Sequence, residues 1–175
     1  LAAYLDTLSP SSVIRIGGNK ADQTFWTSTG ESAPSWSVAT ITPADLTALA
    51  GLANASGWKV ILGVNLKQFD PARAANEAQA AQRALGSSLL DIEIGNEPNL
   101  NRFWMPQFDA EGGDVAAPAY LALLIKVYDA LKRADPELRV WGGALAPRGI
   151  DRPGTGRDTH SPTTFIRDLG AAYRA

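Results

Sequence analysis

Four short apolar segments recur along the chain and are separated by longer, more polar stretches. They run from Val13 to Ile16, Lys59 to Val64, Leu90 to Ile94 and Leu138 to Trp141, and each is followed by Gly or Asn. Short runs rich in Val, Ile and Leu are typical of strands buried on both faces of a parallel sheet. The pattern therefore predicts four parallel β-strands at these positions.

Helical patterns occupy the stretches after these strands. A polar residue followed directly by proline is typical of a helix start, because the polar side chain caps the first turn and proline needs no N–H donor there. This signal occurs at Thr42-Pro43, Asp70-Pro71 and Ser161-Pro162, and we also expect Pro118 to open a helix from Ala119 to about Ala134. Gly57 and Gly86 stand where two of these helices should end.

The resulting order is strand, helix, strand, helix, four times over. This alternation predicts an α/β fold in which a parallel sheet is covered by helices. Two stretches, Lys20 to Thr40 and Gly149 to Ser161, show no regular pattern, and both follow a predicted strand. Barrel enzymes and open α/β sheets both place their sites in loops at the carboxyl ends of strands. We expect a site there.

Composition narrows the possible functions. The 175 residues carry 16 Lys and Arg against 18 Asp and Glu, which does not favour a nucleic-acid partner. The chain has no cysteine and one histidine, so thiolate metal sites and sites with two imidazoles are excluded. We expect no cofactor. No signal peptide or long apolar run is evident, so no membrane partner is expected and the compartment stays open, although secretion suits the function inferred below.

The strongest chemical signal is the segment from Asp91 to Asn99, with the sequence DIEIGNEPN. An apolar strand leads directly to Glu97, which lies between Asn96 and Pro98. Hydrolysis of a glycosidic bond needs a carboxylic acid held rigidly beside the leaving oxygen. A strand end holds a side chain more firmly than a loop does, and proline stiffens the exit. Taken alone, the segment also fits a strand that ends in a polar turn, with Glu97 capping the next segment.

Four motifs in sequence carry a family resemblance. Gly95-Asn96-Glu97-Pro98 resembles the acid/base motif on the fourth strand of clan A glycoside hydrolases, which are retaining (β/α)8 barrels. The segment from Ile14 to Asp22 (IRIGGNKAD) is similar to the second strand of the heparanase and β-glucuronidase family, glycoside hydrolase family 79. Leu62 to Asn65 looks like its third strand, and Val140 to Gly143 lies where its fifth would fall.

The resemblance implies a partial (β/α)8 TIM barrel in which residues 1–175 form an incomplete catalytic domain, with strands two to five and their helices. It implies a retaining glycosidase of β-linked sugars, with Glu97 as acid/base, and favours uronic-acid glycosides. The nucleophile of clan A enzymes lies on the seventh strand, so we expect it not to be in this chain. Activity would then need the remainder of the barrel, and the chain alone should be inactive. Glu111 and Asp114, the next acids downstream, are expected to be solvated loop charges.

Arg15 and Glu93 lie inside two predicted strands, where an unpaired charge is costly. Side chains alternate along a strand, so Glu93, Gly95 and Glu97 should share one face. If that face lines the barrel, Glu93 lies deeper than Glu97, and Arg15 is the candidate partner for it. The alternative is that each charge sits at a solvated strand end.

Several further residues are candidates for substrate binding. Asn96, Asn19, Asp22 and Asn65 follow strand ends and can hydrogen-bond sugar hydroxyls, although ordinary turn formation explains the last three equally well. Trp26, Trp36 and Trp104 can stack on pyranose rings or pack in the core. His160 precedes a predicted helix start, and packing is its simpler explanation.

Other functions fit parts of the pattern. The Asn-Glu-Pro core is shared with cellulase-like and xylanase-like clan A enzymes, so it does not choose the sugar. A non-catalytic carbohydrate-binding relic of a barrel is a second alternative, and a missing second carboxylate would distinguish it. Nucleotide binding by Gly17-Gly18-Asn19 lacks the glycine pattern of either common phosphate-binding loop. The expected partner is a carbohydrate.

Overall fold

The computed structural model describes residues 1–100 and 105–175. Its main sheet has four parallel strands in the order β1 (Val13–Ile16), β4 (Lys59–Val64), β5 (Leu89–Asn96) and β6 (Val140–Ala144). Helices α2 (Pro43–Ser56), α3 (Pro71–Leu85), α4 (Ala116–Ala134) and α5 (Pro162–Arg174) follow these strands. The fold is therefore the predicted alternating α/β fold, with part of a barrel wall.

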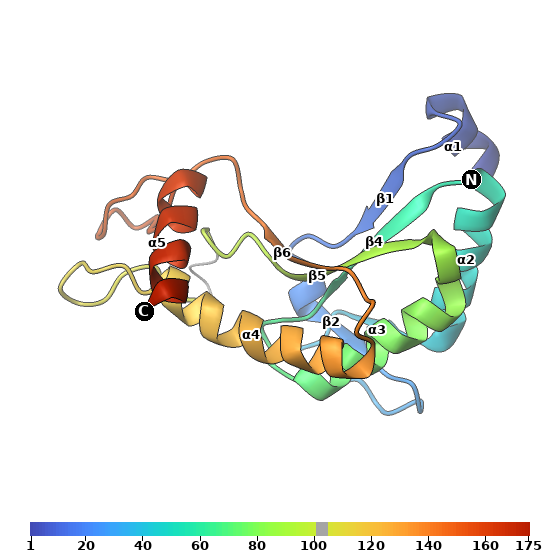
Figure 1. Cartoon of the computed structure of the whole chain (residues 1–175), viewed down its shortest axis with the longest axis horizontal. Coiled ribbons are helices and arrows are strands. Elements are labelled where there is room, and N and C mark those ends of the chain that lie inside the picture. Colours follow the sequence, from blue (N-terminus) through green and yellow to red (C-terminus); the bar gives the residue numbers. More distant parts are fainter. Residues whose placement is uncertain (101–104) are drawn as a thin grey trace.

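Helices α2, α3 and α4 lie along the same side of the four strands, as Figure 1 shows. Alternate strand residues face them: Val60, Leu62 and Val64 on β4 and Ile92 and Ile94 on β5 belong to the buried core. This one-sided cover is the arrangement of a (β/α)8 barrel, whose helices form an outer ring. The other side of the strands, which would face the barrel axis, carries the polar residues described below.

The helix starts follow from the capping signals. The Asp45 carboxylate accepts a hydrogen bond from the backbone N–H of Thr42 at 2.9 Å. Asp70 accepts from the N–H of Arg73 at 2.9 Å, and Ser161 Oγ accepts from Thr164 at 3.3 Å. Helix α2 ends at Ser56, and the next residue, Gly57, has a φ of 71° that suits a residue without a side chain. The three predicted Pro-initiated helices are confirmed.

Other boundaries differ from the sequence prediction. Helix α4 begins at Ala116 rather than Ala119, because Asp114 accepts the N–H of Ala116 at 2.9 Å and Pro118 still falls within the first turn. Strand β6 begins two residues later than predicted and extends through Gly142 and Gly143.

The stretch from Lys20 to Thr40, predicted to be irregular, contains regular structure. A short 3-10 helix, η1 (Ala21–Gln23), leads into β2 (Thr24–Trp26), which pairs in parallel with β3 (Ala39–Ile41). An N-terminal helix, α1 (Ala2–Leu8), was also not predicted, and a second 3-10 turn, η2 (Gly86–Ser88), precedes β5. Among the helices that the structure describes, none is long and apolar enough to cross a membrane.

Candidate functional site

The candidate residues gather at the carboxyl ends of neighbouring strands. Asn19 follows β1, Asn65 follows β4, and Asn96 and Glu97 stand at the end of β5. Because β1, β4 and β5 are parallel neighbours, these ends meet at one edge of the sheet. Three separate sequence motifs are therefore brought to the place where α/β enzymes carry their sites.

The guanidinium of Arg15 links strand β1 to strand β5. Arg15 Nη2 and Nε each lie 2.8 Å from Glu93 Oε2, so the expected ion pair is present. The same Nη2 donates to Asn96 Oδ1 at 2.8 Å, and Asn96 Nδ2 donates to Asn19 Oδ1 at 2.9 Å. The other Glu93 oxygen accepts the backbone N–H of Ala144 at 3.0 Å. A continuous network thus runs from β6 through Glu93 and Arg15 to the two asparagines.

The pair is less enclosed than expected. The Glu93 side chain is 3% exposed, but that of Arg15 is 38% exposed because β1 is an edge strand of the described sheet. Gly17 provides the space for this pair. A Cβ at that position would lie 3.2 Å from Glu93 Oε2 and 3.3 Å from Arg15 Cζ. A larger residue would push the carboxylate and the guanidinium out of line.

Strict alternation does not describe the end of β5. It would place Glu93 and Asn96 on opposite faces, yet both contact Arg15. The reason is Gly95, whose φ of 77° is a left-handed conformation that glycine adopts without steric cost. The resulting twist turns Asn96 toward the polar network.

Glu97 has an unusual backbone. Its φ is 46°, a value uncommon for a residue with a side chain. The conformation is held by the N–H of Glu97, which donates to Ala144 O on β6 at 2.7 Å. The residue is half-buried, and no hydrogen bond or ion pair from residues 1–100 or 105–175 is made to its carboxylate. Strained backbone of this kind is concentrated at functional sites.

Asn99, for which no role was predicted, fixes the exit from this motif. It is fully buried, and its Nδ2 donates to the backbone oxygens of Ala146 at 3.1 Å and His160 at 2.9 Å. Its Oδ1 accepts the N–H of Ala146 at 3.0 Å. The loop after β6 is thereby attached to the loop that carries Glu97. A second asparagine so soon after a strand end was the available signal.

Asp22 and Asn65 have partners within turns. Asp22 is buried, and its Oδ1 accepts the N–H groups of Leu66 and Lys67 at 3.0 and 3.1 Å. Asn65 Nδ2 donates to Thr24 O at 3.0 Å, and its Oδ1 accepts from Gln68 N at 3.1 Å. These two residues shape the turn after β4, whereas Asn19 and Asn96 hydrogen-bond to each other in the network.

Asp114 and His160 form a structural cluster rather than a substrate site. His160 is 1% exposed, stacks on Phe108 with ring centroids 4.4 Å apart, and places Nδ1 3.1 Å from Gln107 Oε1. Gln107 Nε2 donates to Pro98 O, so its Oε1 is the acceptor and Nδ1 carries a proton.

The expectation of solvated loop charges holds for Glu111, which is exposed, but is wrong for Asp114. The Asp114 side chain is 20% exposed, and its Oδ1 lies 3.2 Å from His160 Nε2. Burial, together with the neighbouring Asp168 carboxyl, raises the pKa of Asp114. The helix start and the loop after β6 pack around this carboxyl, which accounts for its burial.

Within the described residues, no group of three or more His, Cys, Asp or Glu side chains could hold a metal ion. Trp26 is buried and its indole N–H donates to Asn76 Oδ1 at 2.7 Å, which gives it a packing role. Trp36 is half-buried, and Trp104 lies outside the described residues. Of the three candidate tryptophans, Trp36 thus has the most available surface within the part that the structure describes.

Comparison with known proteins adds a relation of fold. No family model and no curated protein matches the sequence. Among solved structures, the chain is similar to a 4-O-α-L-rhamnosyl-β-D-glucuronidase from Fusarium oxysporum 12S, determined as a complex with Rha-GlcA. The sequence identity is 24% and the TM-score is 0.63, over 98% of this chain and 36% of the fungal chain. The chain therefore has the fold of about a third of that enzyme.

Proposed function

We propose that this chain is the acid/base-bearing part of a retaining glycoside hydrolase that acts on β-linked uronic-acid glycosides. One observation carries the proposal: Glu97 stands at the end of β5 in a strained backbone that β6 holds, beside an asparagine fixed by Arg15. The backbone of Glu97 is held in place, and its carboxyl has no hydrogen-bond or ion-pair partner among the described residues, as suits a group that acts on a ligand. The glycosidase fold of the fungal enzyme supports this assignment.

In this proposal Glu97 first donates a proton to the leaving-group oxygen and later removes one from water. Asn96 and Asn19 hold a sugar hydroxyl next to the reacting carbon, and Arg15 and Glu93 keep Asn96 in place. A retaining enzyme also needs a nucleophilic carboxylate about 5 Å from the acid/base. Among the described strands of the main sheet, β5 alone is followed directly by a carboxylate. We therefore assign the nucleophile to another strand of the barrel, outside these residues.

The uronic acid is chosen from two sources, the motif resemblance and the activity named for the fungal enzyme. A cellulase-like or xylanase-like activity shares the Asn-Glu-Pro motif and is the alternative within enzymes. A non-catalytic carbohydrate-binding barrel would keep the fold and lack turnover. Hydrolysis of aryl β-glucuronides compared with aryl β-glucosides and β-xylosides, measured on the enzyme with its complete barrel, decides among the three.

Glu97→Gln, made in the enzyme with its complete barrel, tests the role of the carboxyl. Glycosides with poor leaving groups should be hydrolysed about a hundred- to ten-thousand-fold more slowly, because general acid assistance is lost. Formation of the glycosyl-enzyme from a dinitrophenyl glycoside should be nearly unaffected, because that leaving group needs no proton. The measurement is the rate of aglycone release, with Glu111→Gln, an exposed acid downstream in the same loop region, as the matched control. Unchanged turnover of a poor-leaving-group glycoside by Glu97→Gln would show that Glu97 is not the acid.

A further inference from the structure

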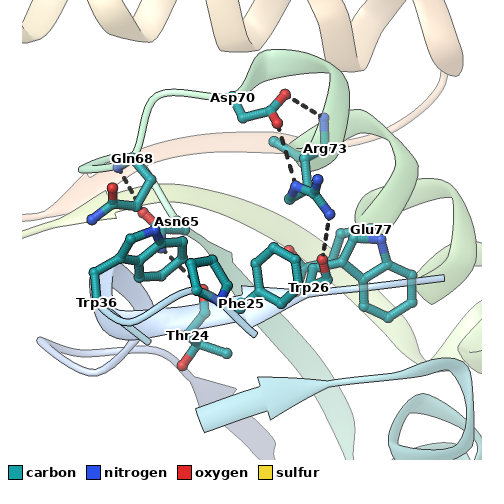
Figure 2. A pocket seen from close by; sticks show the side chains of 11 residues that line it. Thr24, Phe25, Trp26, Trp36, Asn65, Gln68, Asp70, Arg73 and Glu77 are labelled. Carbon is teal, nitrogen blue, oxygen red and sulfur yellow. Dashed lines mark hydrogen bonds and ion pairs between the residues drawn. The ribbon is translucent and has the colours of Figure 1, made fainter. Parts of the chain in front are cut away.

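A cavity of about 250 Å³ lies between β2, the β2–β3 connection and the first turns of α3 (Figure 2). Its wall is formed by Phe25, Trp26 and Trp36, and its polar side chains include Asn65, Arg73 and Glu77. None of Arg15, Asn96 and Glu97 lines it. The cavity therefore shares Asn65, at the end of β4, with the sheet edge described above, but it does not include the polar network at the end of β5.

The aromatic wall has one ring with an available surface. The rings of Phe25 and Trp36 pack edge to face, with their centroids 6.0 Å apart and an interplanar angle of 77°. The Arg73 guanidinium covers Phe25, 4.6 Å from the ring centroid. Arg73 is itself held by Trp26 O at 2.8 Å and by Glu31 at 3.1 Å. Trp26 is buried, whereas Trp36 is only half-buried. A flat apolar ligand face can therefore stack on Trp36.

Glu77 provides the second, independent observation. It is 5% exposed, lines the cavity, and has no hydrogen bond or ion pair with any residue that the structure describes. Burial raises its pKa to about 8, so the carboxyl is mostly neutral at neutral pH and can both donate and accept a hydrogen bond. A buried polar group of this kind normally has a partner. A ligand in the cavity would supply one.

We propose that this cavity binds one neutral pyranose ring, stacked on Trp36 with a hydroxyl hydrogen-bonded to Glu77. A volume below the roughly 300–1,000 Å³ of most ligand sites suits a single ring. Charged ligands are disfavoured. A cation would be repelled by the guanidinium of Arg73, and an anion would be repelled by Asp70 and Glu31, whose ion pairs with Arg73 already neutralise its charge. The choice of a sugar as occupant rests on the proposed function, whereas the cavity and its unpartnered carboxyl do not.

The test is titration of the protein with methyl β-D-glucopyranoside, followed by calorimetry and by tryptophan fluorescence. Trp36→Ala and Glu77→Leu should each weaken binding about tenfold or more, because the stacking surface or the hydrogen-bond partner is lost. Glu77→Gln should preserve binding, since an amide also donates and accepts. Wild-type affinity should fall as the pH rises through about 8, and the affinity of Glu77→Gln should not.

Trp141→Ala, which removes an exposed tryptophan from β6, is the matched control, and circular dichroism checks that each variant is folded. Glu97→Gln should bind the sugar here as well as wild type does, whatever its effect on hydrolysis. The site proposal is overturned by an absence of saturable binding to folded wild-type protein. It is also overturned if Glu97→Gln abolishes binding and Trp36→Ala does not, because the sugar would then bind at the end of β5. Tighter binding of methyl β-D-glucuronide or of tetramethylammonium than of the neutral sugar would overturn it as well. Because this experiment measures binding and not hydrolysis, a negative result does not contradict the role proposed for Glu97, which the hydrolysis assay tests separately.

Discussion

Glu93 and Glu77 are both almost fully buried carboxyls, and they differ in what surrounds them. Glu93 accepts hydrogen bonds from Arg15 and from the backbone of Ala144, so its charge is compensated. Glu77 has no such partner among the described residues, and burial alone raises its pKa to about 8. A buried carboxylate with compensating partners can stay charged and hold the geometry of a site, whereas a buried carboxyl without a partner favours the neutral form and loses stability as the pH rises.

The pH dependence of stability follows from Glu77. The unfolded chain loses this proton near the ordinary value of 4.5, and the folded chain keeps it until about 8. The contribution of neutral Glu77 to the free energy of unfolding is thus complete below pH 4.5, declines as the pH rises from 4.5 to about 8, and is lost above about 8. Its full size is on the order of a few kcal/mol. Urea unfolding should show this decline for wild type and a flatter profile for Glu77→Gln, and parallel profiles would contradict it.

Tyr120 shows how a helix fixes the relative position of two strands. Its side chain reaches from α4 across the core, and its hydroxyl donates to Ile94 O on β5 at 3.0 Å and accepts the N–H of Gly143 on β6 at 2.6 Å. The residue is 2% exposed. Two residues beyond Ile94, β5 ends at Asn96, so this bridge supports the part of the sheet that positions the candidate site.

Tyr120→Phe should therefore destabilise the fold by about 1–3 kcal/mol, because the buried carbonyl of Ile94 and the half-buried N–H of Gly143 both lose their hydrogen bond to the hydroxyl. The measurement is the midpoint of chemical unfolding. Tyr128→Phe on the same helix is the matched control, since that side chain is 42% exposed and the substitution should change stability by less than about 0.5 kcal/mol. Equal effects of the two substitutions would show that the bridge contributes nothing.

Elements with a strong local signal could be predicted, and those held by distant contacts could not. The β1 and β4 segments are apolar runs bounded by turn residues, and Thr42, Asp70 and Ser161 stand at the predicted helix starts. Strands β2 and β3 have three residues each, too few to show a period. In the site, the strand-end position of Glu97 was evident, but the partners of Asn99 lie 47 and 61 residues further along the chain. No local pattern reports such contacts.

In the whole molecule, helices cover one face of the sheet, and the two strands at its edges, β1 and β6, each have one neighbouring strand. In the described sheet, β1 pairs only with β4, and β6 only with β5. A closed barrel pairs every strand on both sides. Edge strands expose unpaired N–H and C=O groups and invite pairing with another strand. Exposed apolar side chains also lie on these edges, with Val13 at 42% and Trp141 at 46%.

We therefore expect a polypeptide of these 175 residues to self-associate through its edge strands, β1 and β6. Its weight-average mass, measured by sedimentation equilibrium, should rise with concentration above that of the 18.5 kDa monomer. Val13→Lys and Trp141→Lys together should weaken this association about tenfold or more, because charges on an edge oppose strand pairing. Ile166→Lys on α5 is the control, since Ile166 is 59% exposed but lies on a helix and should leave the association unchanged. If Ile166→Lys weakens association as strongly as the strand variants do, the contact is made through α5. A monomer at every concentration would show that neither edge is used.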